Sequence, residues 1–478
     1  MTEMKENSVM TVDLAVLGGG PGGYSAAFRA ADLGLSVALI EKDDRLGGVC
    51  LNVGCIPSKT LLHAAEVIRE AESAVDYGIR FAAPSVDLDQ LRSHKDSVVA
   101  TLTSGLAKMA KARKVQVVSG VGTFSDSHTI AVTGSAGDSR TVSFSSAIIA
   151  SGSSPVNLPA GMVDYSDTRT WDSTRALELS SVPESLVIIG GGIIGLEMAA
   201  VYQALGSQIH VVEMLDQIIP SADADVVRPL MQVLRKRYAG IHTGTKVTGI
   251  SQEGPRLSVQ LEGRKAPQQI DADAVLISVG RRPNSAELGL ENIGLTPDAR
   301  GFIAVDDTQR TDIPHIFAIG DVVGNPMLAH KAVHQGKAAA EAAAGMKHAF
   351  SALTIPSVAY TDPEVAWMGV TEREAAEKEI RYRKGVFPWS ASGRALSSGA
   401  AKGMSKALFD EESGRLIGAA IVGKHAGELL SEAVLALEMG ADAADISLTV
   451  HAHPTLSETF AGAAEIVHGS VTDLLPGK

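Results

Sequence analysis

Cysteine is scarce in this chain, with two residues among 478, and both lie within one short segment. Long apolar segments are missing too: no run of eighteen apolar residues occurs, which excludes a membrane-spanning helix. Residues Met1–Met10 lack the basic start and apolar run of a secretory signal, and we therefore expect a cytoplasmic protein. Structural disulfides are rare in that reducing compartment, so a lone cysteine pair is better explained as a catalytic couple than as a staple.

An excess of positive charge is absent as well. The formal net charge is −13, which argues against nucleic acid or an anionic membrane as a partner and would suit a basic partner surface. Hydrophobic residues make up 45% and charged residues 20%, as in a soluble globular protein. A chain of this length buries a large core and is expected to divide into two to four domains.

The two cysteines lie in the segment Gly47–Lys59, which reads GGVCLNVGCIPSK. An ideal helix places residues five apart about 8–9 Å from each other at Cα, whereas a disulfide requires about 7 Å or less. If Cys50 and Cys55 form a disulfide, this segment is therefore not a straight helix, and Gly54 and Pro57 are suited to the distortion. The alternative is a pair of unrelated buried thiols.

A dinucleotide-binding pattern opens the chain. It predicts a buried strand at Val12–Leu17, a glycine-rich turn, a helix at Tyr24–Leu33 and a strand at Ser36–Ile40 that ends at Glu41. In a GxGxxG turn the first glycine permits the tight turn, the second lets the backbone approach a pyrophosphate, and the third lets the helix pack on the strand. The helix N-terminus offers N–H donors to the phosphates, and Glu41 a carboxylate to a ribose diol. The alternative is a glycine-rich turn in an ordinary α/β protein.

The same unit recurs in the middle of the chain. A predicted strand at Leu186–Ile189 precedes a second glycine-rich turn, a helix at Leu196–Leu205 and a strand at Gln208–Val212 that ends at Glu213. In both units the third glycine lies eleven residues before the glycine that ends the helix and eighteen residues before the acid. This repeated spacing predicts two dinucleotide sites in one chain.

Helices and short strands are expected between and after these motifs. Residues 60–115 are predicted to be mostly helical, and residues 250–272 to form an antiparallel insert. The apolar residues at helical spacing in the first segment are expected in the core: Leu61, Leu62, Ala65, Ile68, Leu102, Leu106 and Met109. Further predicted strands are Val115–Val118, Gly122–Phe124, Thr311–Asp321, Ile355–Tyr360, Met404–Asp410 and Leu416–Val422, and further helices are Glu428–Met439 and a helix after Pro454.

Domain boundaries are expected where each unit ends in an apolar strand and a Gly-x-x-Pro turn, at Ile148–Pro155 and Val275–Pro283. The fold class is therefore α/β, with two Rossmann-like dinucleotide-binding domains and a C-terminal α+β domain. The expected divisions are residues 1–152 and 283–350 for the first dinucleotide-binding domain, 153–282 for the second, and 351–478 for the α+β domain.

A second chemical motif, HAHPTLSE, lies at His451–Glu458. Pro454 is suited to be the first residue of a helix, so we expect His453 just outside the helix and Glu458 in its early turns. A histidine held by a carboxylate is the arrangement of a general base, and thiol–disulfide exchange needs a proton acceptor. The alternative is an ordinary helix entry. Lys59, close to Cys55, is either a surface lysine or a charge that stabilises a reduced flavin.

With these motifs together, the chain resembles the class I pyridine nucleotide–disulfide oxidoreductases from about Val12 to about Leu475. Within that family it is most similar to the members that oxidise protein-bound dihydrolipoyl groups with NAD⁺. The resemblance implies one tightly bound FAD per subunit on the first unit, NAD⁺ or NADH on the second, and a homodimer formed through the α+β domain. The partners it implies are lipoyl domains on the E2 core of 2-oxo acid dehydrogenase complexes, or the glycine-cleavage H protein. One departure is Ser154, where many members carry arginine.

The resemblance also implies catalytic roles. Cys50 would be the interchange thiol that meets the substrate, and Cys55 the thiolate next to the flavin. His453 would be the base, oriented by Glu458, and both would reach the site from the other subunit.

Further roles implied by the resemblance concern the cofactors. Lys59 would pair with Glu197 near the flavin. The residues implied at the FAD site are Gly18, Gly20, Pro21, Gly23, Glu41, Lys42, Gly48, Lys59, Gly122, Gly152, Asp321, Met327, Leu328 and Ala329. Those implied at the NAD site are Gly190, Gly192, Ile193, Ile194, Gly195, Glu213, Val247, Val279, Gly280 and Arg281. No metal site is expected.

The choice of nucleotide follows from the residues after the second unit's last strand. Members that use NADPH carry arginines there, whereas this chain has Glu213 and Asp216. A carboxylate favours a free 2′-hydroxyl and repels a 2′-phosphate, so NAD is expected. Two alternatives remain: an NADH-dependent flavoprotein reductase of another small disulfide, and a non-catalytic dinucleotide-binding or scaffold subunit of a larger complex.

Overall fold

The computed structural model describes residues 9–475, apart from the side chain of Glu253. The predictions for the first eight and the last three residues therefore lie outside the described residues. The chain forms two compact units: one comprises Met1–Leu61, Asp87–Val156 and Gly280–Ser351, and the other comprises Leu62–Val86, Asn157–Val279 and Ala352–Lys478. None of the helices within residues 9–475 has both the length and the apolar character needed to cross a bilayer.

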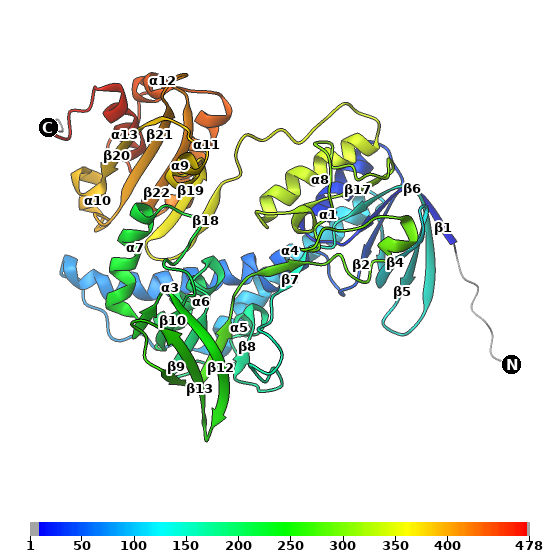
Figure 1. Ribbon diagram of the computed structural model, residues 1–478, viewed down its shortest axis with the longest axis horizontal. Helices are drawn as coiled ribbons and strands as arrows, with labels where there is room; N and C mark the ends of the chain where they lie inside the picture. The colour runs from blue at the N-terminus through cyan, green and yellow to red at the C-terminus, as the bar shows by residue number, and fades with distance from the viewer. Residues whose placement is uncertain (1–8, 476–478) are drawn as a thin grey trace. The chain divides into compact units, whose positions relative to one another are not determined.

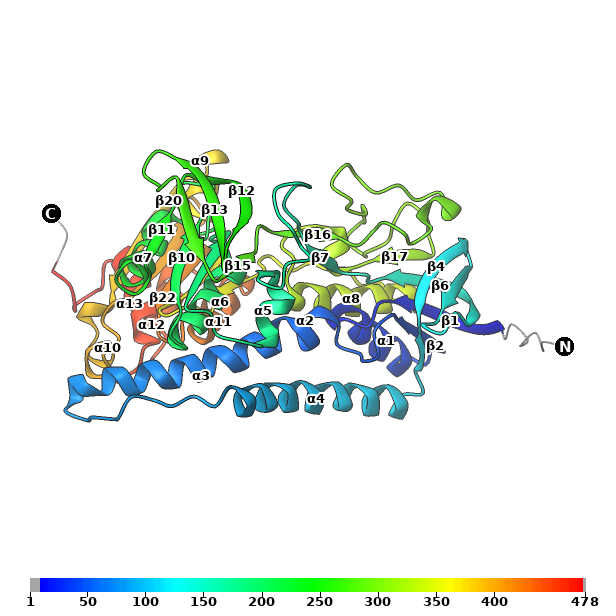
Figure 2. The ribbon, with the colours of Figure 1, turned by 90° about the horizontal axis from the view of Figure 1, so that it is seen from below.

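A seven-stranded sheet organises the first unit, in the order β3-β2-β1-β6-β5-β4, with β17 paired to β6. The strands are β1 (Val9–Leu17), β2 (Val37–Glu41), β3 (Gln116–Ser119), β4 (Val121–Asp126), β5 (Thr129–Thr133), β6 (Ser139–Ile149) and β17 (Ile316–Ala318). Strands β1, β2, β3, β6 and β17 run parallel, while β4 and β5 form an antiparallel extension. The helices α1 (Pro21–Asp32) and α8 (Ala329–Ala343) pack against each other beside this sheet (Figure 2). This arrangement confirms the predicted first dinucleotide-binding unit.

The predicted helical segment, residues 60–115, comprises most of α3 (Cys55–Ser73), η1 (Ala74–Tyr77) and α4 (Leu88–Ala112), and the short helix α2 (Gly48–Val53) precedes it. Of the predicted core positions, Leu61, Leu62, Ala65, Ile68 and Leu106 are buried. The prediction is wrong for Leu102 and Met109, which are each 41% exposed. They lie seven residues apart on the outer side of α4, because the side of α4 that packs inward carries Val99, Leu106 and Ala110.

The second unit contains the repeated motif. Its parallel sheet has the order β11-β10-β9-β15-β8, and a three-stranded antiparallel sheet, β12-β13-β14, confirms the predicted insert. The strands are β8 (Thr170–Trp171), β9 (Ser185–Ile189), β10 (Gln208–Val212), β11 (Gly240–His242), β12 (Thr245–Glu253), β13 (Arg256–Gly263), β14 (Gln269–Ala272) and β15 (Ala274–Ile277). The helices are α5 (Ser173–Glu178), α6 (Ile193–Ala204) and α7 (Ala224–Arg237).

Residues 352–475 form an antiparallel sheet of order β18-β19-β22-β21-β20, covered by helices (Figure 1). The strands are β18 (Ser357–Ala359), β19 (Glu364–Gly369), β20 (Tyr382–Pro388), β21 (Met404–Asp410) and β22 (Leu416–Gly423). The helices are α9 (Glu372–Glu377), η4 (Trp389–Ala391), α10 (Gly393–Ser397), α11 (Ala426–Glu438), α12 (Ala443–Leu448) and α13 (Glu458–His468). The predicted α+β character is confirmed, and the sheet has two strands, β19 and β20, beyond the three predicted.

Candidate active site

The two cysteines lie on either side of a break between helices. Helix α2 ends at Val53, Gly54 adopts φ −144° and ψ −113°, and α3 begins at Cys55. A side chain at Gly54 would place its Cβ only 2.7 Å from the carbonyl oxygen of Val49, so this position requires glycine. The segment is thus not a straight helix, which is the condition for a disulfide between Cys50 and Cys55. Pro57 does not contribute to the break, because it lies in the first turn of α3, where proline is tolerated.

The two thiols differ in their surroundings. Both are cysteine thiols rather than a disulfide in this structure, with Cys50 half-buried and Cys55 exposed. The pKa of the Cys50 thiol is raised, first by its hydrogen bond with the Cys55 side chain and then by burial, although Lys59 acts in the opposite direction. Cys55 is the first residue of α3, where the helix dipole favours negative charge. The geometry therefore favours a thiol at Cys50 and a thiolate at Cys55.

The two glycine-rich loops share the same geometry. Gly18 and Gly190 adopt φ +110° and φ +108°, in the left-handed region that glycine favours. A Cβ at Gly23 would lie 1.8 Å from the Gly18 carbonyl oxygen, and one at Gly195 would lie 2.3 Å from that of Gly190. The third glycine of each motif is therefore required for close packing of helix on strand, as predicted.

The second glycine of each motif faces open space. A Cβ at Gly20 would meet its nearest neighbour only at 3.9 Å, and one at Gly192 would meet nothing within 4 Å. Pro21 and Ile193 follow as the first residues of α1 and α6, so backbone N–H groups of both helix N-termini border this space. Each loop thus forms a cradle suited to an anionic phosphate group.

The two acids close these loops. Glu41 accepts a hydrogen bond from the Gly19 N–H at 2.7 Å, and Glu213 accepts one from the Gly191 N–H, also at 2.7 Å. Glu41 and Glu213 are both buried, and burial raises the pKa of Glu41 against the backbone hydrogen bonds that lower it. Their contact with a ribose, predicted from the sequence, stays a prediction.

Around the first loop, three distant segments meet at Asp321, which lies in η3 (Gly320–Val323). The hydroxyl of the buried Ser153 donates to Asp321 Oδ2 at 2.5 Å, and Arg281 donates to that hydroxyl at 2.7 Å and to the Ser153 carbonyl at 2.6 Å. Ser153 and Arg281 come from β7 (Ser153–Pro155) and β16 (Arg281–Pro283), the two Gly-x-x-Pro segments, which pair in antiparallel fashion. Arg281, predicted at the NAD site, therefore bonds Ser153 in this unit.

The remaining predicted cofactor residues of this unit lie in its loops and element ends. Gly122 lies in β4, where a Cβ would come within 2.5 Å of Leu17, so no side chain fits. Gly152 adopts φ +71° with open space around it. Lys42 is exposed after β2, Gly48 begins α2, and Met327, Leu328 and Ala329 are half-buried where α8 begins.

The predicted NAD residues of the second unit divide into exposed and buried positions. Ile194 and Val279 are exposed, at 36% and 41%. Val247 is 6% exposed, and its side chain packs in a core cluster with Val259 and Ile277. Only the backbone of Val247 is therefore placed to line a nucleotide site.

His453 and Glu458 form the predicted pair. His453 Nδ1 lies 2.8 Å from Glu458 Oε1, and Glu458 Oε2 accepts from the Thr455 N–H at 2.6 Å. Burial raises the pKa of the Glu458 carboxyl, but the hydrogen bonds from Thr455 and His453 outweigh it and hold that pKa below its usual value. An ionised carboxylate accepts the Nδ1 hydrogen, which leaves the lone pair on Nε2 of His453 to accept a proton.

The predicted helix start is wrong. Helix α13 begins at Glu458 rather than at Pro454, because residues 453–457 form a turn around the Glu458 carboxylate. The consequence is that the carboxylate stands at the helix start and faces back toward His453 and Thr455.

Lys59 and Glu197 belong to different units, and their pairing stays a prediction. Within its own unit, the buried Glu197 of α6 accepts from the Tyr360 N–H at 3.2 Å.

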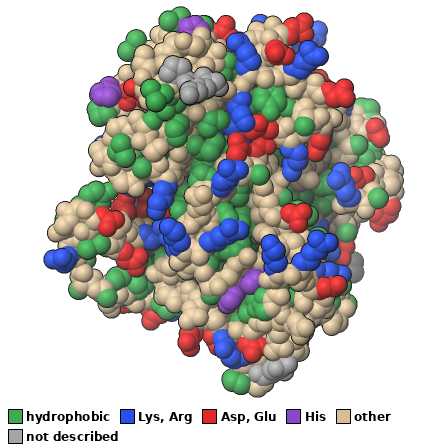
Figure 3. Space-filling view, turned by 60° about the vertical axis from the view of Figure 1, so that its left-hand side comes forward, with side chains coloured by type: hydrophobic (Ala, Val, Ile, Leu, Met, Phe, Trp, Pro, Cys, Tyr) green, Lys and Arg blue, Asp and Glu red, His purple; other side chains and the backbone are tan. Residues whose placement is uncertain are grey.

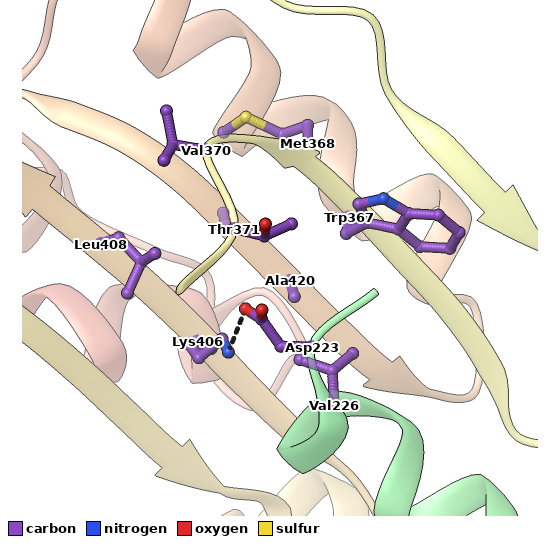
Figure 4. Close-up of a pocket in the computed structure, with 10 residues that line it drawn as sticks. Asp223, Val226, Trp367, Met368, Val370, Thr371, Lys406, Leu408 and Ala420 are labelled. Atoms are coloured by element: carbon purple, nitrogen blue, oxygen red, sulfur yellow. Dashed lines mark hydrogen bonds and ion pairs between the residues drawn. The ribbon is translucent and has the colours of Figure 1, made fainter. Parts of the chain in front are cut away.

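A small pocket in the second unit is lined by Asp223 and Lys406, an ion pair that Figure 4 shows. The pair belongs to an ion cluster that the sequence did not indicate. Lys406 of β21 is 2% exposed at its side chain, and its Nζ lies 2.8 Å from Asp223, 2.8 Å from Asp225 and 2.9 Å from Glu372. The ammonium group lies among the three carboxylates and offsets part of their negative charge. No sequence motif marks this cluster, since its members lie up to 183 residues apart.

The chain matches two family models: pyridine nucleotide-disulphide oxidoreductase over residues 12–336, and the dimerisation domain of the same family over residues 355–464. The protein therefore belongs to the pyridine nucleotide-disulphide oxidoreductase family. It is 54% identical over 462 residues to dihydrolipoyl dehydrogenase of Vibrio cholerae, covering 96% of each chain. It is also 54% identical to dihydrolipoyl dehydrogenase of Haemophilus influenzae, again covering 96% of each.

Solved structures agree on the fold. LpdA from Mycobacterium tuberculosis matches with a TM-score of 0.87 and 26% identity, covering 96% of this chain and 99% of that one. The HOCl-induced flavoprotein disulfide reductase RclA from Escherichia coli matches with a TM-score of 0.84 and 26% identity, covering 95% of this chain and 100% of that one.

Proposed function

We propose that this chain is a dihydrolipoyl dehydrogenase, which oxidises protein-bound dihydrolipoyl groups to the cyclic disulfide and reduces NAD⁺ to NADH. The observation that carries this proposal is the Cys50–Cys55 pair at the break between α2 and α3, in a chain that shares 54% identity with relatives of that name. Two thiols in contact, one held as thiol and the other favoured as thiolate, are the groups that thiol–disulfide exchange requires.

Two dinucleotide cofactors fit the two glycine cradles, FAD at the first loop and NAD⁺ at the second. The fit rests on the open space at Gly20 and Gly192, which a side chain would fill, and on the helix N-termini beside it. Asp321, Gly122, Gly152, Lys42, Gly48 and residues 327–329 complete the FAD site, with Lys59 and Glu197 paired near the flavin. Glu213, with Ile193, Ile194, Val279, Gly280 and the backbone of Val247, completes the NAD site. When bound, FAD supplies the two-electron chemistry that links the dithiol to NAD⁺.

The chain's own residues move the protons and exchange the sulfur bonds. Starting from the Cys50–Cys55 disulfide, His453 Nε2 accepts a proton from one substrate thiol, and the resulting thiolate bonds to Sγ of Cys50. The disulfide breaks and Cys55 leaves as thiolate. The second substrate sulfur then displaces Cys50 and its proton passes to the Cys50 sulfur, so that the substrate is a disulfide, Cys50 is a thiol, Cys55 a thiolate and His453 is protonated. The substrate loses two electrons and the cysteine pair gains them.

A homodimer brings the base to the thiols. The dimerisation domain covers residues 355–464, which include His453. Apolar side chains are exposed on α11, on α12 and beside the histidines: Leu435 at 64%, Met439 at 77%, Leu448 at 76% and Val450 at 96%. Side chains of this kind are expected to be covered by a second copy. His453 of the partner subunit then serves the cysteine pair, oriented by its own Glu458.

The macromolecular partners are lipoyl domains, carried by the E2 core of a 2-oxo acid dehydrogenase complex or by the glycine-cleavage H protein, in the cytoplasm. Figure 3 shows Lys, Arg, Asp and Glu side chains on the face that it draws, and the formal net charge of the chain, −13, suits a protein partner with a basic surface better than a polyanion. We further propose the domain division 1–152 and 283–350 for FAD, 153–282 for NAD, and 351–478 for the interface.

Replacing Cys50 by serine tests the proposal. Cys50→Ser removes the sulfur that receives the substrate thiolate, so dihydrolipoamide oxidation by NAD⁺ should fall below detection. A His94→Gln variant on the exposed surface of α4 is the control and should keep wild-type turnover. Full activity of Cys50→Ser would show that the exchange does not pass through this pair.

A second candidate is an NADH-dependent flavoprotein reductase of another small disulfide, which the similarity to RclA favours. A panel of disulfides reduced by NADH, compared with dihydrolipoamide oxidation by NAD⁺, separates the two. Faster turnover of any other disulfide than of lipoamide would favour the reductase.

A further inference from the structure

A second histidine–carboxylate pair lies two residues before the base. His451 Nε2 is 2.6 Å from Glu432 Oε1, and His451 Nδ1 is 2.9 Å from the Thr449 carbonyl oxygen. The His451 side chain is only 11% exposed, and that of Glu432 is 35% exposed. Glu432 lies in α11, so this pair ties the segment that leads to His453 to a different helix from the one that carries Glu458.

The hydrogen-bond partners of His451 determine which of its ring nitrogens carry a hydrogen. A carbonyl oxygen only accepts hydrogen bonds, and an ionised carboxylate also only accepts them. Donation from both ring nitrogens of His451 satisfies these two acceptors, and only the cationic ring carries a hydrogen on each nitrogen. His453 differs in this respect, because its one carboxylate partner leaves Nε2 available for a proton.

The charges around His451 come from three segments. Glu432 of α11 bonds it directly, and two carboxyl groups of α13 interact with its charge. Burial and Asp473 raise the pKa of Glu465 and His451 opposes them, while His451 adds to the hydrogen bonds that hold the pKa of Glu458 down. Glu458 is influenced by His453 as well as by His451, so both rings act on one carboxylate. Asp473 and His468 also interact electrostatically with Glu465.

We propose that His451, held as a cation by Glu432, is a positioning residue for the base: it anchors residues 449–453 to α11, and its charge favours the neutral, proton-accepting form of His453. This inference rests on the proposed function and concerns the same site. Both rings act on the Glu458 carboxylate, and a positive charge at His451 disfavours a second positive charge on the neighbouring imidazole.

The pH profile of kcat/KM for dihydrolipoamide, from about pH 5.5 to pH 9, tests this. In His451→Gln the midpoint of the acid limb should rise by about 0.5–1 pH unit, since the positive charge is lost. In His451→Lys, which keeps the charge, the midpoint should stay at the wild-type value even though kcat falls. His468→Gln is the control, because it removes an exposed histidine of α13 and should leave the profile unchanged.

Two results would overturn the inference. One is an unchanged midpoint in His451→Gln, whatever happens to kcat; the other is an equal shift in His451→Lys. If His451→Gln does not fold, Glu432→Gln serves in its place and should shift the midpoint in the same direction. A wild-type protein inactive with dihydrolipoamide would instead contradict the proposed function itself.

Discussion

Glu41 and Glu213 show how single residues make the two dinucleotide motifs recognisable. Each carboxylate accepts from the glycine N–H 22 residues earlier, so the acid at the strand end fixes the shape of the preceding loop. The second oxygen accepts from the backbone two residues later, at Asp43 and at Leu215. The identical spacing in the sequence therefore reflects an identical closed loop in both units.

Glu364 is a residue whose charge state differs between the folded and unfolded chain. Burial raises its pKa to about 7, against the hydrogen bond from the Gly427 N–H, and the neighbouring Glu66, Glu428 and Asp362 add to the increase. The usual value is 4.5, so the folded state holds a proton that the unfolded chain has already released. The contribution of Glu364 to the free energy of unfolding is therefore fully present below about pH 4.5 and is lost as the pH rises toward about 7. Above that pH it does not change further.

Replacing Glu364 by glutamine should remove this loss. Glu364→Gln keeps an oxygen that accepts from Gly427 but cannot ionise, so it should be more stable than the wild type by about 1–2 kcal/mol at pH 8 and equal to it at about pH 4. Urea unfolding at both pH values measures the difference, with the exposed Glu377→Gln on α9 as control. Equal stability of variant and wild type at pH 8 would show that ionisation of Glu364 does not lower the free energy of unfolding.

Lys406 joins three elements of the second unit. It lies on β21, on the side of the sheet where α7 packs, and its three carboxylate partners come from the start of α7 and from α9. Burial raises the pKa of Glu372, but the hydrogen bonds from Lys384 and Lys406 outweigh it and lower that pKa to about 2. Burial likewise lowers the pKa of Lys406, but its bonds to the three carboxylates outweigh it and raise that pKa. The buried amino group thus offsets part of the negative charge of a partly exposed carboxylate cluster between elements.

Removing this cation should be far more costly than removing its exposed neighbour. Lys406→Met leaves the three carboxylates without their buried partner and should lower stability by about 3–5 kcal/mol. Lys384→Met is the matched control, because Lys384 also bonds Glu372 but is 39% exposed, and it should cost less than about 1 kcal/mol. Thermal and urea unfolding compare the two. Similar losses in both variants would mean that the cluster does not depend on Lys406.

At the scale of the whole molecule, the features that depend on local sequence patterns were predicted, whereas the contacts between distant segments were not. Both glycine-rich units, the antiparallel insert and the α+β character followed from spacing and alternation, since these depend on residues close in sequence. The ion cluster of Lys406, the Ser153–Asp321–Arg281 contacts and the His451–Glu432 pair were missed, because each joins separate elements. For the His451–Glu432 pair, the sequence offered one indication, which is that His451 lies two residues from His453 in the same motif.

The joint arrangement of cysteine pair and flavin is tested most directly by the absorption spectrum of the purified holoenzyme during anaerobic titration with dihydrolipoamide. A long-wavelength band should appear as the Cys55 thiolate forms beside the flavin, should be present without substrate in Cys50→Ser, and should be absent from Cys55→Ser. No band in the wild type, or the same band in Cys55→Ser, would contradict the account.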